Sequence, residues 1–364
     1  MARLGDVCEK VTSNILQKDL EGHNGSYPIY GASGFIANVD FYQQEKPYIA
    51  VVKDGAGIGR IMKLPAKSSV IGTMQYIIPN DAVDISYLAY AMEHMNLSKY
   101  FTGATIPHIY FKDYQREEFL LPPLDEQRKI AAVLDKVSDL IAKRRQQLDK
   151  LDELVKSRFI EMFGDPVTNP KGWPTCELSQ HIIFLTSGSR GWTKYFTDEG
   201  EYFITIKNVK NCRITLDDVQ HIVPPNNAEA KRTRVQEGDL LISITADLGR
   251  TGVVTKEIAN HGGYINQHLT CIRLNQSAVR SLYVAYYLES DAGKGQFQIK
   301  NQSAVKAGLN FNSINTLRLM VPPVDLQNTF ISFVEQTDKS KLAVQQGLQE
   351  LEILKKSLMQ EYFE

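Results

Sequence analysis

The feature that most constrains this chain is an internal repeat. Residues 120–134 read LLPPLDEQRKIAAVL, and residues 320–334 read MVPPVDLQNTFISFV. A gapless alignment of 120–163 with 320–363 gives roughly a dozen identities, too many for a chance match. They include Pro122/Pro322, Pro123/Pro323, Asp125/Asp325, Gln127/Gln327, Leu148/Leu348, Leu151/Leu351, Leu154/Leu354, Lys156/Lys356, Ser157/Ser357 and Phe163/Phe363.

Each copy of the repeat predicts a long helix. The proline pair ends an extended segment, and Asp125 or Asp325 is expected to cap the helix that follows. Apolar residues then recur at alternating spacings of three and four, which is typical of a coiled coil. This stripe comprises Leu134, Val137, Ile141, Leu148, Leu151, Val155 and Met162 in the first copy, interrupted by Arg144 and Arg158, and Val334, Val344, Leu348, Leu351, Leu358 and Tyr362 in the second, interrupted by Lys341 and Lys355. The glycine and proline at 164 and 166 predict that the first helix stops near residue 163.

The length of these helices predicts that they pair with each other. A helix of about 38 residues is about 57 Å long, more than one small domain can cover. A narrow apolar stripe of that length favours a partner of equal length, and the other copy is the obvious one. The alternative is a pair of unrelated amphipathic helices, each packed on its own domain.

The repeat extends upstream of the helices. YIAVVKDGAGIGRI (48–61) is similar to DLLISITADLGRTGVV (239–254), and VIGTMQYII (70–78) is similar to YINQHLTCI (264–272). These runs indicate β-strands joined by glycine-containing turns, and the segments 87–95 and 282–290 follow as short helices. The repeated unit is therefore a mixed α/β domain of about 120 to 160 residues followed by a long helix.

Composition limits the class of protein. The 364 residues are 43% hydrophobic, which predicts at least two folded domains. No signal pattern or long apolar span occurs, so we expect a cytoplasmic protein without a membrane segment. The four cysteines lack metal-binding or disulfide spacing, so no metal site is expected. The net charge is −1, but residues 165–323 carry +3, which points to a local surface for any polyanion rather than a uniformly basic protein.

These motifs carry a family resemblance. YGASGFI (30–36), KDGAGIGR (53–60), LLPPLDEQRKIAAVLD (120–135), LDELVKSRFIEMFGD (151–165), INQHLT (265–270) and VPPVDLQ (321–327) resemble the specificity subunit of type I restriction-modification systems, over essentially the whole chain. The resemblance implies a mixed α+β fold with two target recognition domains and two conserved helical regions that pair as an antiparallel, pseudo-twofold coiled coil. The boundaries would be 1–122 and 165–323 for the recognition domains, and 123–164 and 324–364 for the helical regions.

The resemblance also implies a function. Such a subunit is non-catalytic, binds double-stranded DNA at an asymmetric bipartite site in the prokaryotic cytoplasm, and recruits two methyltransferase subunits and two restriction subunits. S-adenosylmethionine would bind the methyltransferase partner, with no cofactor in this chain, and N6 of adenine would be the modified atom. An antiparallel helix pair makes the two domains face opposite strands. Four inserted residues lengthen a helix by about 6 Å, close to two base-pair rises, so insertions should change the spacer between half-sites.

Candidate DNA contacts are polar or cationic residues in turns, which can reach base edges or phosphates. In the first domain they are Lys53, Arg60, Thr73, Gln75, Tyr76, Thr105 and His108. In the second they are Arg190, Trp192, Lys194, Lys207, Asn208, Lys210, Arg250, Asn266, Gln267, His268, Lys300, Gln302 and Lys306. For each residue the alternative is an ordinary solvated side chain, and Asn266 and Gln267 could instead satisfy buried backbone groups.

Partner contacts are expected on the outer faces and ends of the paired helices. The candidates are Arg128, Lys129, Arg144, Arg145 and Lys156, and the alternative is again a solvated helix face.

Catalytic motifs give little support to an enzyme. In the glycine run 55–59 the last glycine of a nucleotide-binding loop is replaced by Arg60, and Pro65 forbids the helix that must follow. No GxSxG, HExxH, GxxxxGK[ST] or Asn-Pro-Pro-aromatic sequence occurs. Three alternatives stay open: the specificity subunit of a type IIB-like system, a coiled-coil scaffold with two protein-binding modules, and a self-sufficient hydrolase or methyltransferase.

Overall fold

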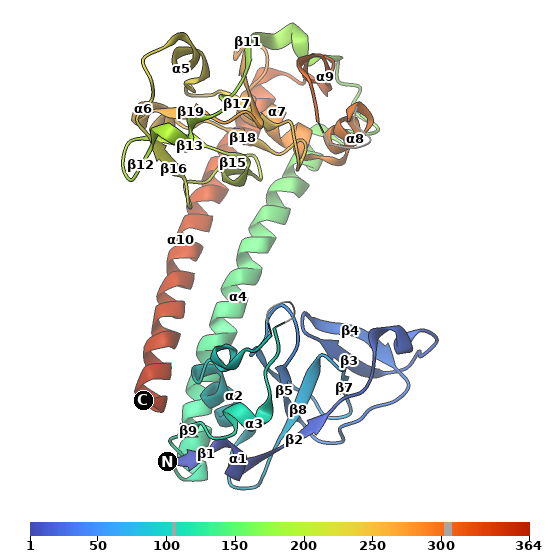
Figure 1. Ribbon diagram of the computed structural model, residues 1–364. Helices are drawn as coiled ribbons and strands as arrows, with labels where there is room; N and C mark the ends of the chain where they lie inside the picture. Colours follow the sequence, from blue (N-terminus) through green and yellow to red (C-terminus); the bar gives the residue numbers. More distant parts are fainter. Residues whose placement is uncertain (104–106, 302–307) are drawn as a thin grey trace. The chain divides into compact units, whose positions relative to one another are not determined.

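The computed structural model describes residues 1–103, 107–301 and 308–364. The chain divides into two compact units (Figure 1). Unit 1 comprises Met1–Gln147 and Ala343–Glu364, and unit 2 comprises Leu148–Leu342. Each unit therefore contains a globular α/β part together with stretches of both long helices. This division differs from the four segments expected from sequence, because the boundaries of the units pass through the helices.

The core of unit 1 is a four-stranded antiparallel sheet in the order β2-β8-β5-β6. Its strands are β2 (Cys8–Thr12), β8 (Met74–Pro79), β5 (Tyr48–Val52) and β6 (Ile61–Leu64). Helix α2 (Ile85–His94) packs against β5 and β6. Asp84 caps this helix, because its carboxylate accepts hydrogen bonds from the amides of Ser86 and Tyr87.

Unit 2 repeats this arrangement. Its four-stranded antiparallel sheet has the order β11-β20-β17-β18. The strands are β11 (Ile182–Ser187), β20 (Leu269–Leu274), β17 (Leu240–Ser243) and β18 (Thr251–Val253). Helix α7 (Ser281–Glu289) takes the place of α2. The upstream repeat predicted from the sequence is therefore confirmed, with the two glycine-containing turns at equivalent places.

A second sheet in each unit contains one parallel strand pair. In unit 1 the order is β4-β3-β7, and in unit 2 it is β12-β16-β13-β19. Their strands are β3 (Tyr27–Gly31), β4 (Gly34–Val39), β7 (Ser69–Val70), β12 (Phe196–Thr197), β13 (Glu201–Ile204), β16 (Gln220–Ile222) and β19 (Gly263–Ile265).

Short elements complete each unit. Two-stranded sheets join β1 (Ala2–Arg3) to β9 (Glu118–Phe119) and β10 (Thr175–Glu177) to β21 (Arg318–Met320). Short helices are α1 (Leu4–Val7), α3 (Phe111–Tyr114) and α9 (Phe311–Asn315). Unit 2 further contains β14 (Val209–Lys210), β15 (Arg213–Ile214), α5 (Ala228–Thr233), α6 (Lys256–His261) and α8 (Asp291–Lys300).

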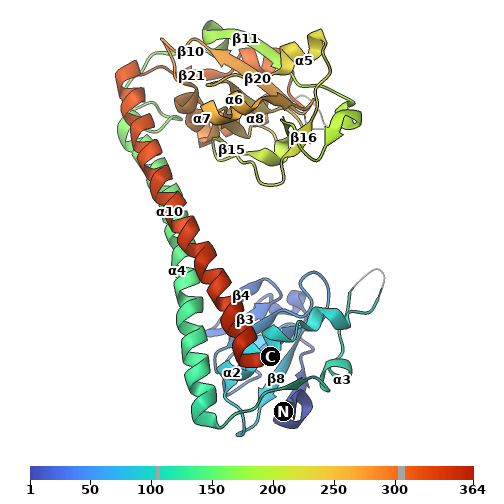
Figure 2. The ribbon, with the colours of Figure 1, turned by 90° about the vertical axis from the view of Figure 1, so that its left-hand side faces the viewer.

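The long helices α4 (Leu124–Phe163) and α10 (Val324–Phe363) each have 40 residues. In unit 1, Nη2 of Arg145 in α4 lies 2.6 Å from Oε1 of Glu352 in α10. In unit 2, Asp152 pairs with Lys341. In the core of unit 1 the start of α4 (Leu134) packs with the end of α10 (Phe363), and in the core of unit 2 the end of α4 (Phe163) packs with the start of α10 (Phe330). The helices therefore run antiparallel within each unit (Figure 1 and Figure 2). The predicted pairing is confirmed, and separate packing of each helix on its own domain is excluded.

Aromatic residues anchor the helices to each domain. In unit 2 the ring of Phe163 lies 4.8 Å from that of Tyr283 and 5.6 Å from that of Phe330. The equivalent contact in unit 1 joins Phe363 to Tyr87 at 5.1 Å. Repeated residues of the two copies thus make repeated contacts, which accounts for the identity of Phe163 and Phe363. Within the residues that the structure describes, we find no helix with the length and apolar character of a membrane span.

The start of each long helix differs from the sequence prediction. Asp125 and Asp325 lie inside the first turn rather than before it. The amides of Glu126 and Gln127 instead donate to the carbonyl of Pro123. The predicted aspartate caps are therefore wrong, and these carboxylates act on the positive end of the helix dipole from within the first turn.

The repeated glutamine has the structural role that the aspartate lacks. In unit 1 the Gln127 side chain accepts a hydrogen bond from the amide of Asp84 (2.8 Å) and donates to the carbonyl of Pro122 (2.7 Å). In unit 2, Gln327 makes the same bonds with Arg280 (2.8 Å) and Pro322 (2.8 Å). Both glutamines are buried, and each ties the start of a long helix to the turn before α2 or α7.

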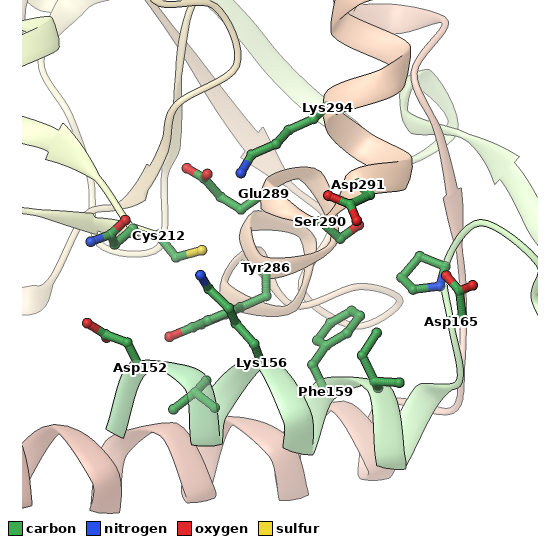
Figure 3. Close-up of a pocket in the computed structure, with 14 residues that line it drawn as sticks. Asp152, Lys156, Phe159, Asp165, Cys212, Tyr286, Glu289, Ser290, Asp291 and Lys294 are labelled. Atoms are coloured by element: carbon green, nitrogen blue, oxygen red, sulfur yellow. The ribbon is translucent and has the colours of Figure 1, made fainter. Parts of the chain in front are cut away.

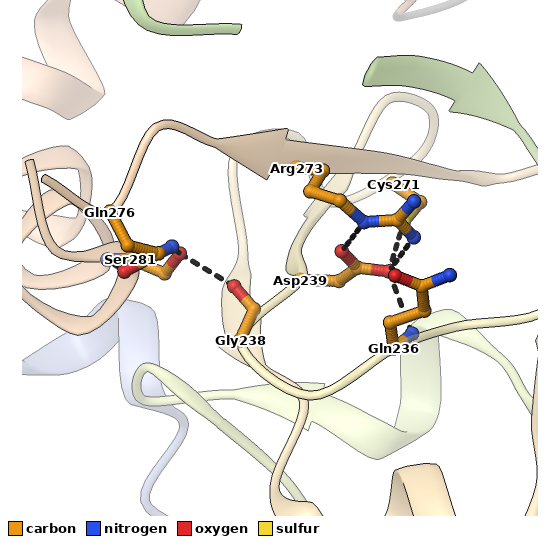
Figure 4. Close-up of polar contacts among 7 residues, drawn as sticks. All are labelled: Gln236, Gly238, Asp239, Cys271, Arg273, Gln276 and Ser281. Atoms are coloured by element: carbon orange, nitrogen blue, oxygen red, sulfur yellow. Dashed lines mark hydrogen bonds and ion pairs between the residues drawn. The ribbon is translucent and has the colours of Figure 1, made fainter. Parts of the chain in front are cut away.

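A buried ion pair fixes the turn before β17 in unit 2 (Figure 4). The carboxylate of Asp239 is fully buried and accepts from Nε and Nη2 of Arg273 at 2.8 and 2.9 Å. It also accepts from the amide of Gln236 (2.8 Å) and from Cys271 Sγ (3.2 Å). Beside it, Ser281 at the start of α7 donates to the carbonyl of Gly238. This network holds the central strand against the neighbouring strand and helix.

Candidate nucleic-acid interface

The two units present one polar edge each, at the end of the strand β5 or β17. In unit 1 the amide of Ile109 donates to the carbonyl of Lys53, and in unit 2 the amide of Leu309 donates to that of Ile244. The carbonyls of Thr73 and His268 accept from the amides of these same turn residues, Lys53 and Ile244. Three chain segments therefore meet at an equivalent place in each unit: the turn, the residue before β8 or β20, and the loop before α3 or α9.

In unit 1 the polar edge consists of Lys53, Asp54, Thr73 and His108. Asp54 hydrogen-bonds His108 Nδ1, and its other oxygen lies 3.7 Å from Lys53 Nζ. Burial lowers the pKa of His108, and the charge of Lys53 lowers it further. A neutral imidazole at pH 7 can both donate and accept hydrogen bonds. Thr73 is exposed beside this pair, so the edge offers several groups that could read base edges.

Arg60 lies at the end of the glycine turn that starts at Lys53. It is exposed, and its Nη1 donates to the carbonyl of Ala32 at 2.7 Å. This bond ties the glycine turn to the tip of the β3–β4 hairpin. The guanidinium thus keeps unused donors for a phosphate or base while one donor positions it.

In unit 2 the polar edge consists of Thr245, Asn266, Gln267 and His268, all half-buried. His268 Nδ1 lies 2.7 Å from Thr245 Oγ1, and its Nε2 lies 3.1 Å from the side-chain nitrogen Nε2 of Gln267. Asn266 accepts from the amide of His268. Asn266 thus has the backbone role considered as its alternative, whereas Gln267 and His268 keep polar groups near the surface.

Four of the predicted DNA contacts are buried and cannot meet DNA directly in this structure, so these predictions are wrong. Gln75 and Tyr76 lie in the central strand β8, where their side chains bond Tyr114 and Gln43. Trp192 packs on the rings of Phe203 and Tyr264. The amide of Asn208 is fully used, accepting from Thr205 and donating to the carbonyls of Thr215 and Asp217. Gln75 and Tyr76 are adjacent and point to opposite faces of β8, and both are buried because both faces of this central strand are covered. Local turns place the other two toward the core.

The other predicted cations of unit 2 are exposed or have partners, and Arg190 directly follows Ser189, whose carbonyl accepts from the backbone amide of Gln267. Arg190, Lys194, Lys207 and Lys210 are exposed. Arg250 pairs with Asp247, and Lys300 donates to Thr316 Oγ1 at 2.7 Å. The four exposed cations fit phosphate contacts better than base readout. Thr105, Gln302 and Lys306 lie outside the described residues.

Sequence reasoning missed two residues of this region. Thr245 faces His268 at the polar edge, where the aligned residue of unit 1 is Asp54. Phe35 is 59% exposed just after the hairpin tip that Arg60 holds. The sequence did contain a signal for Phe35, which is an aromatic residue directly after a glycine-rich hairpin tip. No core covers such a tip, so the aromatic ring is expected to be exposed.

The predicted partner residues have mixed environments on the long helices. Lys129 and Lys156 are exposed, and Arg128 lies 3.4 Å from Asp125. Arg144 donates to Gln147 of its own helix, whereas Arg145 pairs with Glu352 of α10. Arg145 therefore contributes to helix pairing, and Arg144 is the better candidate for a partner contact.

The polar edges offer hydrogen-bond donors and acceptors rather than a metal site. In residues 1–103, 107–301 and 308–364, no three His, Cys, Asp or Glu side chains are grouped to hold a metal ion.

Comparison with known proteins gives the family. A profile of the type I restriction modification DNA specificity domain matches residues 1–153 and 171–353. Curated relatives include the type I restriction enzyme MjaVIII specificity subunit of Methanocaldococcus jannaschii, 23% identical over 273 residues, which cover 67% of this chain and 63% of the relative. Another is the type I restriction enzyme EcoKI specificity subunit of Escherichia coli K12. It is 21% identical over 255 residues, which cover 66% of this chain and 54% of the relative. The chain thus spans less than two thirds of the length of these relatives.

Solved structures show the same fold. The S subunit of a type I restriction-modification system from M. genitalium has a TM-score of 0.58 at 16% identity, covering 100% of this chain and 95% of that one. A structure from a study of complex assembly and conformational transition of the type I system has a TM-score of 0.54 at 17% identity, covering 99% and 96%.

Proposed function

Because this chain belongs to the family of type I restriction-modification DNA specificity subunits, we propose that it reads an asymmetric bipartite DNA site, one half with each unit. The observation that carries this proposal is the polar edge, which has one backbone frame in both units but different side chains. Unit 1 places Asp54 and His108 where unit 2 places Thr245 and Gly308. Because different patterns of donors and acceptors select different base pairs, the half-sites should differ.

The chemistry in this proposal belongs to partner subunits. Two methyltransferase subunits, which carry S-adenosylmethionine, and two restriction subunits in the full complex assemble on this chain, which is itself non-catalytic. The family match supports the assignment, as does the similar fold of a structure from a study of complex assembly. The polar edges fit double-stranded DNA, and the exposed face of the long helices fits a protein partner.

The spacing of the half-sites tests the proposal, because both long helices continue from one unit into the other. Insertion of one heptad into each helix, after Gln147 and after Leu342, keeps the apolar stripe in phase. Seven residues add about 10 Å, close to three base-pair rises. Methylation of DNA substrates with varied spacers should then favour a spacer about three base pairs longer, with both half-sites unchanged.

The control for this experiment is a heptad inserted after Asn226, in an exposed loop of unit 2. It should leave the preferred spacer unchanged. A spacer that stays the same in the helix variant as well would contradict the proposal.

Arg144 supplies a prediction about partner binding. Arg144→Glu reverses an exposed charge that bonds Gln147 of its own helix and lies beside Gly347 of α10. No side chain of α10 at position 347 is displaced, so the fold should be kept. If the methyltransferase covers this face, the Kd of the complex should rise about tenfold. Lys143→Glu is the matched control on the neighbouring position, and equal affinity of both variants and the parent would argue against Arg144 as a contact.

A further inference from the structure

Unit 2 contains a cavity of about 350 Å³ beside the second half of α4 (Figure 3). Val155 and Phe159 of α4 line one side, and Tyr286 and Glu289 of α7 line another. Cys212, in the turn between β14 and β15, contributes a third side. The cavity thus combines apolar and aromatic side chains with charged groups, which include the carboxylate of Glu289.

Unit 1 has an equivalent place, which the repeat identifies. Asp84 and Arg280 occupy the same position before α2 and α7, because each donates its amide to the repeated glutamine. Tyr90 and Glu93 of α2 therefore correspond to Tyr286 and Glu289 of α7. On the long helices, Lys355 of α10 corresponds to Val155 of α4 in the gapless alignment.

In unit 1 this place holds a cation supplied by the chain itself. Lys355 Nζ lies 2.9 and 3.2 Å from the two carboxylate oxygens of Glu93. The same nitrogen lies 5.4 Å from the centre of the Tyr90 ring, within the range of a cation–π contact. Tyrosine, glutamate and ammonium thus form one site, and the aliphatic stem of Lys355 connects it to α10.

In unit 2 the tyrosine and glutamate are kept, but valine replaces the lysine. Glu289 accepts from the amide and hydroxyl of Thr251 through Oε1 at 2.8 and 3.3 Å. Within the described part of the chain, no lysine or arginine lies within ion-pair distance of Glu289. Lys156 and Lys294 line the cavity without reaching its carboxylate.

Two other carboxylates near this cavity have cations, and Asp165 and Asp291 also line it. Asp152 pairs with Lys341, and Asp338 pairs with Arg213. Glu289 therefore differs from its counterpart in unit 1. Glu93 pairs with Lys355, whereas no cation of the described residues lies within ion-pair distance of Glu289.

We propose that this cavity binds an ammonium or guanidinium group on an aliphatic stem, in the place that Lys355 Nζ occupies in unit 1. The charged group contacts Glu289 and the face of Tyr286, and the stem packs along Val155 and Phe159. A carboxylate and an aromatic face together bind such a group better than either does alone, because the cation exchanges water for two attractive contacts. The ligand could be a basic side chain of a partner protein or a free polyamine, which share this chemistry.

Agmatine, a guanidinium on a four-carbon stem, is the probe. Calorimetric titration of the full chain should give one saturable site, and butyramide, which lacks the charge, should not bind. Glu289→Gln keeps an oxygen for Thr251 but removes the charge, and should raise the Kd for agmatine about tenfold or more. Val155→Lys places the lysine of unit 1 into unit 2 and should abolish agmatine binding.

The reciprocal variant tests the repeat argument directly. Lys355→Val should open the equivalent place in unit 1 and raise the stoichiometry from one agmatine to two. Absence of saturable binding, or binding that neither Glu289→Gln nor Val155→Lys changes, would overturn the proposal.

Two further titrations identify the source of the natural ligand. If agmatine competes with the methyltransferase subunit for binding to the chain, the natural ligand is a basic side chain of that subunit. Spermidine that binds with the same dependence on Glu289, while association with the methyltransferase is unaffected, would identify a free polyamine.

Discussion

Replacement of Asp239 by alanine is expected to lower the free energy of unfolding of unit 2 by about 3 kcal/mol. The fully buried carboxylate accepts two bonds from the guanidinium of Arg273 and one from the amide of Gln236. Without it, a cation packed against the ring of Phe184 loses its partner. Arg273 is 28% exposed and can regain some water, so the low end of the range for a broken buried pair applies.

This change can be measured by tryptophan fluorescence during denaturation. Both tryptophans of the chain, Trp173 and Trp192, lie in unit 2, so the signal reports that unit. Asp247→Ala is the matched control, because it removes a partly exposed ion pair with Arg250 and should cost less than about 1 kcal/mol. An Asp239→Ala protein as stable as this control would show that the pair does not hold the sheet together.

Replacement of Gln327 by leucine should cost about 3 kcal/mol as well. Leucine has a similar volume but leaves the amide of Arg280 and the carbonyl of Pro322 without their bonds. Because Gln327 is 0% exposed, water does not reach this site, and each unsatisfied buried group costs about 1–3 kcal/mol. The tryptophan-monitored unfolding transition of unit 2 should shift accordingly.

Two variants control the Gln327 experiment. Gln336→Leu changes an exposed glutamine of the same helix and should alter stability by less than about 0.5 kcal/mol. Gln127→Leu breaks the equivalent bonds in unit 1, so it should affect far-ultraviolet circular dichroism more than tryptophan fluorescence. Equal stability of Gln327→Leu and Gln336→Leu would contradict the role assigned to the repeated glutamine.

The organisation of the chain could be predicted from the sequence because its signals are local. Proline pairs, heptad spacing and the glycine after Phe163 define α4 within a few residues, and the repeat then defines α10. The apolar runs on either side of the turns at 53–60 and 244–250 likewise indicate antiparallel strands. The helices and the strands both depend on residues that are near one another along the chain, so one sequence is enough to predict them.

The roles of individual polar residues could not be predicted in the same way. Gln75 and Asn208 have the side chains of base readers, but contacts with distant segments bury them. The repeated Gln127 was visible as a motif, yet its role depends on the turn at Asp84, more than 40 residues earlier. The replacement of Lys355 by Val155 was also visible, but its meaning required the position of α7.

The proposal that the two units read two half-sites is tested most directly by sequencing methylated bases in cells. The chain would be expressed with the methyltransferase encoded beside it, and the same cells without the chain would be the control. We expect methylation at one asymmetric bipartite motif with a fixed spacer, lost when the chain is omitted. A stable complex that methylates no such motif, or a motif that persists without the chain, would contradict the assignment.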